Sequence, residues 1–229
     1  MVRPGLVMQN PVSGEDRVVF TKTAQQTGGE VFELEVSIRA GAPGTPEMVH
    51  SLQDESFEIL SGSLDFRIAG QEERRLTAGE GLLIPKGTPH NWWNESDEEA
   101  HALVEITPAL RSEEFFANLY GLCSEKGALP NLLQMAVLVD EHKDEGSYLT
   151  KPPVLVQRVV FGVLAPLGRL LGYKAHYPKY SGLEEEPSSE EGAGPPSTTK
   201  VAVRAAAMVA SLLLTSFFLL RGWRRRLSD

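Results

Sequence analysis

The sequence predicts a mainly β body of the barrel or sandwich type, followed by helices and by a C-terminal transmembrane helix. Up to Pro108, short apolar runs alternate with Gly, Pro or acid-rich breaks, which is typical of the strands of a barrel or sandwich. Beyond Pro108 the apolar residues take helical spacing. Near the end of the chain, residues 205–220 form a run of sixteen residues without a charge.

The composition is that of an ordinary globular protein. The chain has 229 residues, of which 41% are hydrophobic and 23% are charged, and this suits one compact domain with attached segments. Its single cysteine, Cys123, excludes an intramolecular disulfide and a multi-thiolate zinc cluster. Residues 1–180 carry 16 Lys and Arg against 25 Asp and Glu. Because such an acidic body repels phosphates, nucleic acid is not expected as a partner.

The expected strands begin with residues 31–39. Apolar and polar residues alternate there, with Phe32 and Leu34 on one face and Glu33 and Glu35 on the other, which is the period of a half-buried strand. Five further runs are expected to form strands: residues 56–61, 64–68, 81–84, 90–94 and 101–106.

Helices are expected after the strands. Ser112 is the expected N-cap of the first helix, because Glu113 follows in its first turn. A second helix is expected from Asn131 to about His142. The apolar stretch from Val154 to Leu171 is interrupted by arginines and a proline, so it is too broken to span a bilayer. It is expected either to pack across the barrel or to lie in the membrane surface.

The most informative motif lies in residues 79–94, GEGLLIPKGTPHNWWN. The segment fits the pattern G-x5-P-x-G-x2-H-x3-N at all five fixed positions, which are Gly79, Pro85, Gly87, His90 and Asn94. This pattern is the second sequence motif of the cupin superfamily, and the body of the chain resembles a small single-domain cupin. Pro85 and Gly87 suit a tight turn that leads into a strand carrying His90.

The first cupin motif, G-x5-H-x-H-x3,4-E-x6-G, is matched in part. Its second half fits His50, Glu55 and Gly62. Met48 stands where the motif has its first histidine, and the upstream glycine of the motif matches only loosely.

The resemblance implies a cupin-type double-stranded β-helix, a jelly-roll barrel, over about residues 17–108. In cupins that bind metal, the motif histidines and glutamate converge inside the barrel, which here gives His50, Glu55 and His90. Two imidazoles and one carboxylate suit a divalent ion of Fe, Mn, Ni or Zn. Met48 is either a soft thioether ligand or a side chain that fills space. The alternative is a metal-free barrel in which the histidines are hydrogen-bonded core residues.

A mostly apolar pocket for a small organic ligand is expected around these three residues. Phe57, Ile59 and Trp92 share strand faces with the candidate ligands. Met48 is also expected at the pocket, and Glu105 is a candidate for its wall. Core packing alone explains the apolar residues equally well.

The chain is expected to divide into five parts: a barrel domain over residues 1–110, a helical extension packing on it over 111–180, a disordered acidic linker over 181–200, a transmembrane helix over 201–221 and a basic tail over 222–229. Arginines on both sides of the uncharged run, and Trp223 at its exit, favour a membrane anchor over a buried helix.

A single-pass, tail-anchored protein with a cytosolic barrel is therefore expected, since the N-terminus lacks the apolar run of a signal peptide. The arginines that follow the apolar run favour the opposite orientation, so the topology stays open.

Three kinds of function fit these observations. One is a membrane-anchored enzyme whose metal supports oxygenase, isomerase or decarboxylase chemistry. Another is a non-catalytic module that binds a ligand or a partner protein and is tethered to a membrane. A third is a scaffold that forms a homodimer through its sheets. The fold alone does not choose among them.

Overall fold

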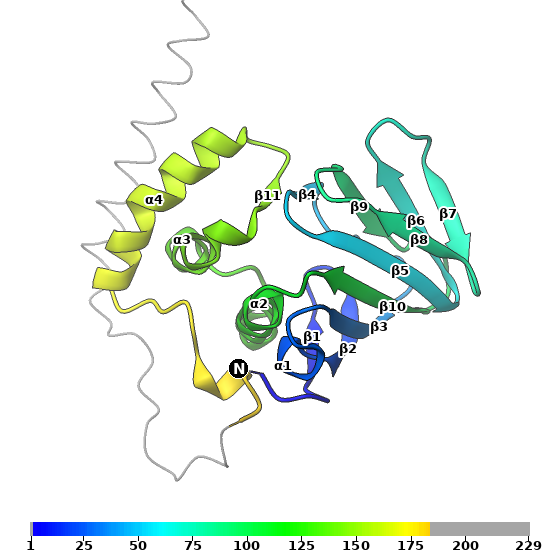
Figure 1. Ribbon diagram of the computed structural model, residues 1–229, viewed down its shortest axis with the longest axis horizontal. Helices are drawn as coiled ribbons and strands as arrows, with labels where there is room; N and C mark the ends of the chain where they lie inside the picture. The colour runs from blue at the N-terminus through cyan, green and yellow to red at the C-terminus, as the bar shows by residue number, and fades with distance from the viewer. Residues whose placement is uncertain (1, 184–229) are drawn as a thin grey trace, which may run out of the picture. The chain divides into compact units, whose positions relative to one another are not determined.

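The computed structural model describes residues 2–183 of the protein. The transmembrane helix expected at 201–221, the basic tail and the expected linker beyond Leu183 lie outside the described residues. Within residues 2–183, no helix combines the length and the hydropathy needed to cross a bilayer. The prediction of a mainly β body followed by helices is confirmed, because two antiparallel sheets face each other and the three longest helices come after β10 in the chain (Figure 1).

The two sheets share eleven strands, and every pairing is antiparallel. The six-stranded sheet has the order β1 (Val7–Asn10), β2 (Glu15–Lys22), β3 (Phe32–Ile38), β10 (Ala100–Thr107), β5 (Asp54–Ser61) and β8 (Gly81–Ile84). The five-stranded sheet has the order β11 (Ser147–Leu149), β4 (Met48–His50), β9 (His90–Trp93), β6 (Ser63–Ile68) and β7 (Arg74–Thr77). Strands that are adjacent in sequence therefore often lie in different sheets.

The core lies between the two sheets because alternate residues of each strand point inward. Strand β10 shows this pattern clearly: Ala102 and Val104 are buried, whereas the residues between them are partly exposed. The same strand pairs with β3 on one side and with β5 on the other. Four phenylalanines fill the space between the sheets and are at most 3% exposed: Phe20, Phe32, Phe57 and Phe66. Burying each of them contributes roughly 1.5 to 3 kcal/mol to stability.

Helix α2 (Ser112–Lys126) packs against β1 and contributes Tyr120 to the core. The expectation that Ser112 caps this helix is wrong, since Arg111 occupies the N-cap position and Ser112 is the first helical residue. The Ser112 hydroxyl accepts a hydrogen bond from the buried Gln53 side chain at 2.8 Å instead. Glu113 of α2 also contacts a short helix, α1 (Ala24–Thr27). The backbone N–H of Ala24 donates a hydrogen bond to the Glu113 carboxylate.

Helix α3 (Leu132–Glu141) lies where the sequence predicts it. Asn131 is its N-cap and accepts a hydrogen bond from the backbone N–H of Gln134 at 3.0 Å. Helix α4 (Val154–Leu170) packs against α3, and Gly168 allows this close approach, because a Cβ there would lie 2.6 Å from Val137. The sequence left two arrangements open for this segment, and one of them was packing across the barrel. Helix α4 packs on α3 instead.

The segment between α3 and α4 returns to the barrel. After the short helix η1 (Lys143–Glu145), β11 pairs with β4 so that Ser147 lies opposite His50. From α4, the Gln157 amide donates to the Leu149 carbonyl of β11 at 2.6 Å. The last short helix, η2 (Pro178–Tyr180), packs on α2, and the carbonyl of Ser181 accepts from the N–H of Arg3 at 2.8 Å.

Glu145 makes stability depend on pH. Its side chain is buried, its Oε1 has no hydrogen-bond partner among the described residues, and burial raises its pKa from 4.5 to about 7. Between these two values the unfolded chain releases the proton while the folded chain keeps it, so the cost to folding grows over this window and is constant above about pH 7.

We therefore expect Glu145→Gln to raise the free energy of unfolding by roughly 1 to 2 kcal/mol at pH 8, allowing for screening by nearby solvent. At pH 4 both states are protonated and we expect no gain. Urea unfolding at the two pH values measures this difference, with Glu72→Gln as a control at an exposed carboxylate. An equal effect at both pH values would contradict the assignment.

Candidate metal centre

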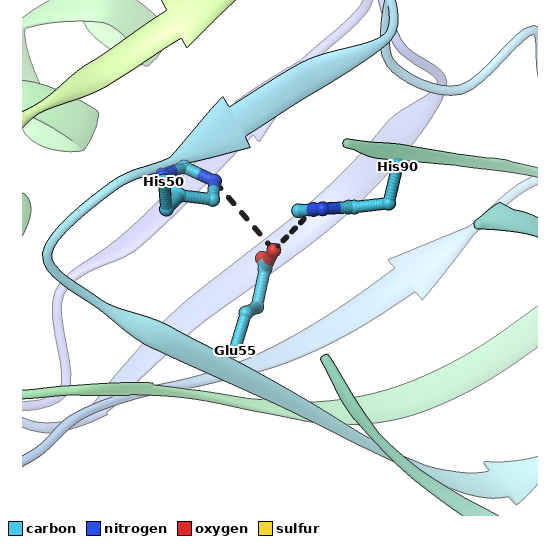
Figure 2. A group of neighbouring side chains, drawn as sticks. All are labelled: His50, Glu55 and His90. Atoms are coloured by element: carbon cyan, nitrogen blue, oxygen red, sulfur yellow. Dashed lines mark hydrogen bonds and ion pairs between the residues drawn. The ribbon is translucent and has the colours of Figure 1, made fainter. Parts of the chain in front are cut away.

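Three buried side chains from different strands meet between the two sheets (Figure 2). His50 ends β4, His90 begins β9, and Glu55 comes from β5 in the opposite sheet. The Glu55 carboxylate lies 2.8 Å from Nε2 of His90 and 3.6 Å from Nε2 of His50. The ligand atoms of all three residues lie within 4.8 Å of one another. The structure thus brings together the three residues that the sequence predicts as metal ligands.

The turn between β8 and β9 sets the position of both histidines. Gly87 has a φ of +80° in this turn, and its N–H donates to the carbonyl of His50 at 2.7 Å. His90 follows, and its Nδ1 lies 2.9 Å from the carbonyl of Thr88. At the end of the motif, the Asn94 amide donates to the carbonyl of Glu98 at 2.9 Å. The glycine and the asparagine of the motif are therefore structural, and its histidine points into the site.

Each imidazole is held through Nδ1, which leaves Nε2 facing the centre. Nδ1 of His50 lies 2.8 Å from the Ser147 hydroxyl, and Nδ1 of His90 donates to the Thr88 carbonyl. Nε2 of His50 is buried and has no hydrogen-bond partner among the described residues. Ligand atoms that share an ion at about 2.1 Å lie roughly 3.0 to 3.4 Å apart, and the separations of 2.8 Å and 3.6 Å between the Glu55 carboxylate and the two Nε2 atoms lie on either side of this range. The residues therefore fit a divalent metal ion.

Burial and mutual contacts shift the pKa values of the three groups in different directions. Burial alone would raise the pKa of Glu55, but the hydrogen bond from His90 and the electrostatic effects of His50 and His90 together outweigh burial, so the pKa is lowered. Burial likewise opposes the charged form of His90, yet the contact with Glu55 raises its pKa. The pKa of His50 is lowered by burial. In the metal-free protein, His90 and Glu55 therefore form a buried ion pair while His50 favours the neutral form.

A small cavity adjoins the three residues. Its volume, counted as the space that the centres of water molecules can reach, is about 50 Å³. This is enough for a few waters or for a molecule of a few heavy atoms. Its wall is apolar except for a few polar groups, and it is lined by Glu15, Leu34, Val36, Ile38, Thr45, Met48, His50, Glu55, Phe57, His90, Trp92, Val104, Phe116 and Tyr120.

Of the residues predicted for the pocket wall, Met48, Phe57 and Trp92 line the cavity. Ile59 does not line it: this side chain is completely buried one pleat further along β5, within the core. Glu105 does not line it either, because it points to the outer face of β10, where it lies 3.6 Å from Nζ of Lys22.

The sequence did not reveal four polar residues around the site. Thr45 lines the cavity, and its buried hydroxyl has no partner among the described residues. Glu15 and Tyr120 line another part of the wall, with the Tyr120 hydroxyl donating to Glu15 at 2.9 Å. Ser147 supports His50 from a strand about a hundred residues away in the sequence. No spacing pattern links these four residues to the two motifs, so only the fold could find them.

Glu15 is a second buried carboxylate in the cavity wall. The Ser13 hydroxyl and the Asn10 amide also donate to it, at 2.5 Å and 3.2 Å. Burial raises its pKa, these hydrogen bonds and that of Tyr120 oppose the rise, and the charge of Glu55 adds to it. The cavity thus contains two acidic groups that interact electrostatically.

Comparison with known proteins agrees with the motifs. The family model described as "Cupin domain" matches residues 34–106. Among curated proteins, the chain is similar to the "Probable oxidoreductase virH" of Hypocrea virens, with 25% identity over 158 residues that cover 62% of this chain and 70% of that protein.

Solved structures also resemble part of the chain. KdgF from Halomonas sp. is 20% identical, with a TM-score of 0.37, over 42% of this chain and 83% of that chain. A predicted oxalate decarboxylase from Thermotoga maritima is 16% identical, with a TM-score of 0.41, over 47% of this chain and 98% of that chain. The polyketide cyclase RemF from Streptomyces resistomycificus is 18% identical, with a TM-score of 0.39, over 46% of this chain and 73% of that chain.

The family match covers most strands of both sheets and all three of the converging side chains. Residues 34–106 of this protein are a domain of the cupin superfamily.

Proposed function

We propose that the protein is a metal-dependent enzyme that acts on a small oxygen-bearing organic molecule in the cupin cavity. The observation that carries the proposal is the buried group of His50, Glu55 and His90, in which Nε2 of His50 has no partner among the described residues. A buried polar atom without a partner is costly, and a metal ion at this point would satisfy it.

The donor set suits Fe(II), Mn(II), Ni(II) or Zn(II), since imidazole and carboxylate ligands are common to all four. When bound, such an ion supplies a Lewis acid or, for a redox-active metal, a centre for electron transfer. Ser147 and the Thr88 carbonyl orient the two imidazoles through Nδ1. The Thr88 carbonyl can only accept, so it fixes the His90 tautomer that carries its proton on Nδ1, and the Ser147 hydroxyl accepts from His50 in the tautomer whose Nε2 is able to coordinate.

The cavity wall defines the class of molecule. The hydroxyl of Thr45 and the pair formed by Tyr120 and Glu15 offer hydrogen bonds to oxygen atoms of a ligand. Phe57 and Trp92 present apolar surface to its carbon skeleton. A mainly apolar wall with a few placed polar groups is the usual make-up of a small-molecule site.

Oxidoreductase chemistry is the reaction class that we propose. The similarity to the Hypocrea virens protein, whose name gives it as a probable oxidoreductase, supports this class. Isomerase and decarboxylase chemistry would use the same three ligands and the same wall. The competing proposal is a non-catalytic module, in which the barrel binds its ligand without metal. Metal analysis distinguishes this module from the enzyme.

Elemental analysis of the purified full chain tests the metal site. We expect close to one equivalent of a divalent transition metal in the parent, and loss of at least about nine-tenths of it in His90→Ala, because two ligands hold an ion far less tightly than three. His101→Ala is the matched control, since His101 lies on the outer face of β10 and pairs with Glu99. A parent protein that binds no metal after incubation with each candidate ion would contradict the enzyme and favour the module.

Ser147→Ala tests the support of His50 by β11. We expect metal affinity to fall by roughly 10- to 100-fold, the usual effect of removing the hydrogen-bond partner of a ligating histidine. Competition against a chromophoric chelator measures this change. Ser56→Ala serves as the control, because Ser56 donates to Glu105 on the outer face of the sheet at 3.4 Å. Unchanged affinity in Ser147→Ala would show that His50 needs no such support.

We also propose that residues 201–221 anchor the protein in a membrane as a single helix, with the barrel in the cytosol. The support is the uncharged run 205–220 and the arginines around it. The homodimer remains a prediction.

Flotation on vesicles after alkaline carbonate treatment tests the anchor. We expect the full chain to float, and the double variant Leu213→Arg, Phe217→Arg to stay in the soluble fraction, because each arginine costs roughly 2.5 to 3.5 kcal/mol at the centre of a span. A parent chain that carbonate strips from the vesicles would rule out a transmembrane anchor.

A further inference from the structure

Helix α4 presents an apolar face that no described residue covers. Six of its ten exposed positions carry large hydrophobic side chains, and the most exposed are Leu155 at 73%, Val163 at 64% and Leu170 at 83%. At about 100° per residue, the apolar exposed positions fall within an arc of roughly 140°. Buried residues such as Ala165 and Gly168 lie on the opposite side, against α3. The helix is therefore apolar both toward α3 and away from it.

Charge is distributed unevenly around this helix. Residues 146–183 contain five Lys and Arg and no Asp or Glu, in a chain whose net charge is -9. Arg169 pairs with Asp140, and Lys179 pairs with Glu125. The other three cations are exposed and make no ion pair within residues 2–183; they are Lys151 before α4, Arg158 within it and Lys174 after it. Arg158 lies over the Tyr148 ring at 5.7 Å but has no carboxylate partner. An apolar helix face bordered by cations that form no ion pair suits an anionic lipid surface.

The segment between α4 and the proposed anchor is short enough for both to reach the same membrane. Seventeen residues, 184–200, separate the last described residue from residue 201, where the proposed span begins. Even fully extended, they reach at most about 60 Å. A span in the bilayer would therefore keep α4 within reach of the same membrane surface at a high effective concentration.

We propose that the exposed face of α4 lies in the interface of the membrane that holds the C-terminal anchor. Leu155, Val163 and Leu170 contact the acyl chains at the headgroup boundary, and Arg158 and its neighbouring cations contact anionic headgroups. This inference rests on the anchor proposed above. It would hold the cupin body beside the bilayer instead of at the end of a free tether.

A fluorescent probe on α4 of the full chain tests this placement. Val163→Cys and Leu83→Cys are each labelled with an environment-sensitive dye; Val163 is 64% exposed, and Leu83 on β8 is 63% exposed and serves as the matched control. The native Cys123 is buried and its pKa is raised by burial to about 11, so it does not compete for the label. The vesicles contain about 30% phosphatidylserine and a lipid with a nitroxide near the headgroup.

We expect nitroxide lipid to quench the Val163 probe by roughly half while the Leu83 probe is nearly unaffected, since quenching needs contact with the interface. Equal, weak quenching at both sites in a chain that floats would overturn the inference and leave the anchor standing. A blue-shifted but unquenched Val163 probe would also overturn it, because the face would then be covered by a second copy of the chain. A chain that does not float would overturn both proposals.

Discussion

The contact on which the site depends is the buried ion pair between Glu55 of one sheet and His90 of the other, with 2.8 Å between their atoms. Charges buried in this way are tolerated only when they are paired, so the two sheets must meet in the register that brings these groups together. His50 lies in contact with the same pair, and its ring centre is 5.5 Å from that of His90. In the metal-free protein the hydrogen bond between His90 and Glu55 lies at the place proposed for a metal ion.

The segment that follows the barrel, residues 111–180, contributes a residue to this site. Strand β11 lies between α3 and α4 in the chain, joins the five-stranded sheet beside β4 and brings Ser147 to His50. The same strand is held from the other side, because Gln157 of α4 donates to the Leu149 carbonyl. Leu149 in turn lies opposite Met48, a residue of the cavity wall. A single strand thus connects the helix with the exposed apolar face to the wall of the cavity.

The local part of this arrangement could be predicted from the sequence, and the non-local part could not. The spacings around His90 in one motif and around Glu55 in the other each describe one turn and one strand, and the resemblance to cupins that these motifs carry implied that His50, Glu55 and His90 converge. For Glu105 the sequence left a pocket wall and a solvated face open, because alternation gives two faces without saying which one is interior. Ser147 and Tyr120 were missed since their positions depend on pairing between distant segments, which a single sequence does not record.

The two buried carboxylates of the cavity bear on the metal ion proposed above. Glu55 and Glu15 lie in the same cavity wall, and burial, with a further contribution from the charge of Glu55, raises the pKa of Glu15. The hydrogen bonds from Ser13, Tyr120 and Asn10 oppose this rise because they stabilise the charged carboxylate, but burial outweighs them. A positive ion at His50, Glu55 and His90 would offset the repulsion between the carboxylates. By linkage, it would lower the pKa of Glu15 and so favour the charged carboxylate, which accepts the hydrogen bond from Tyr120.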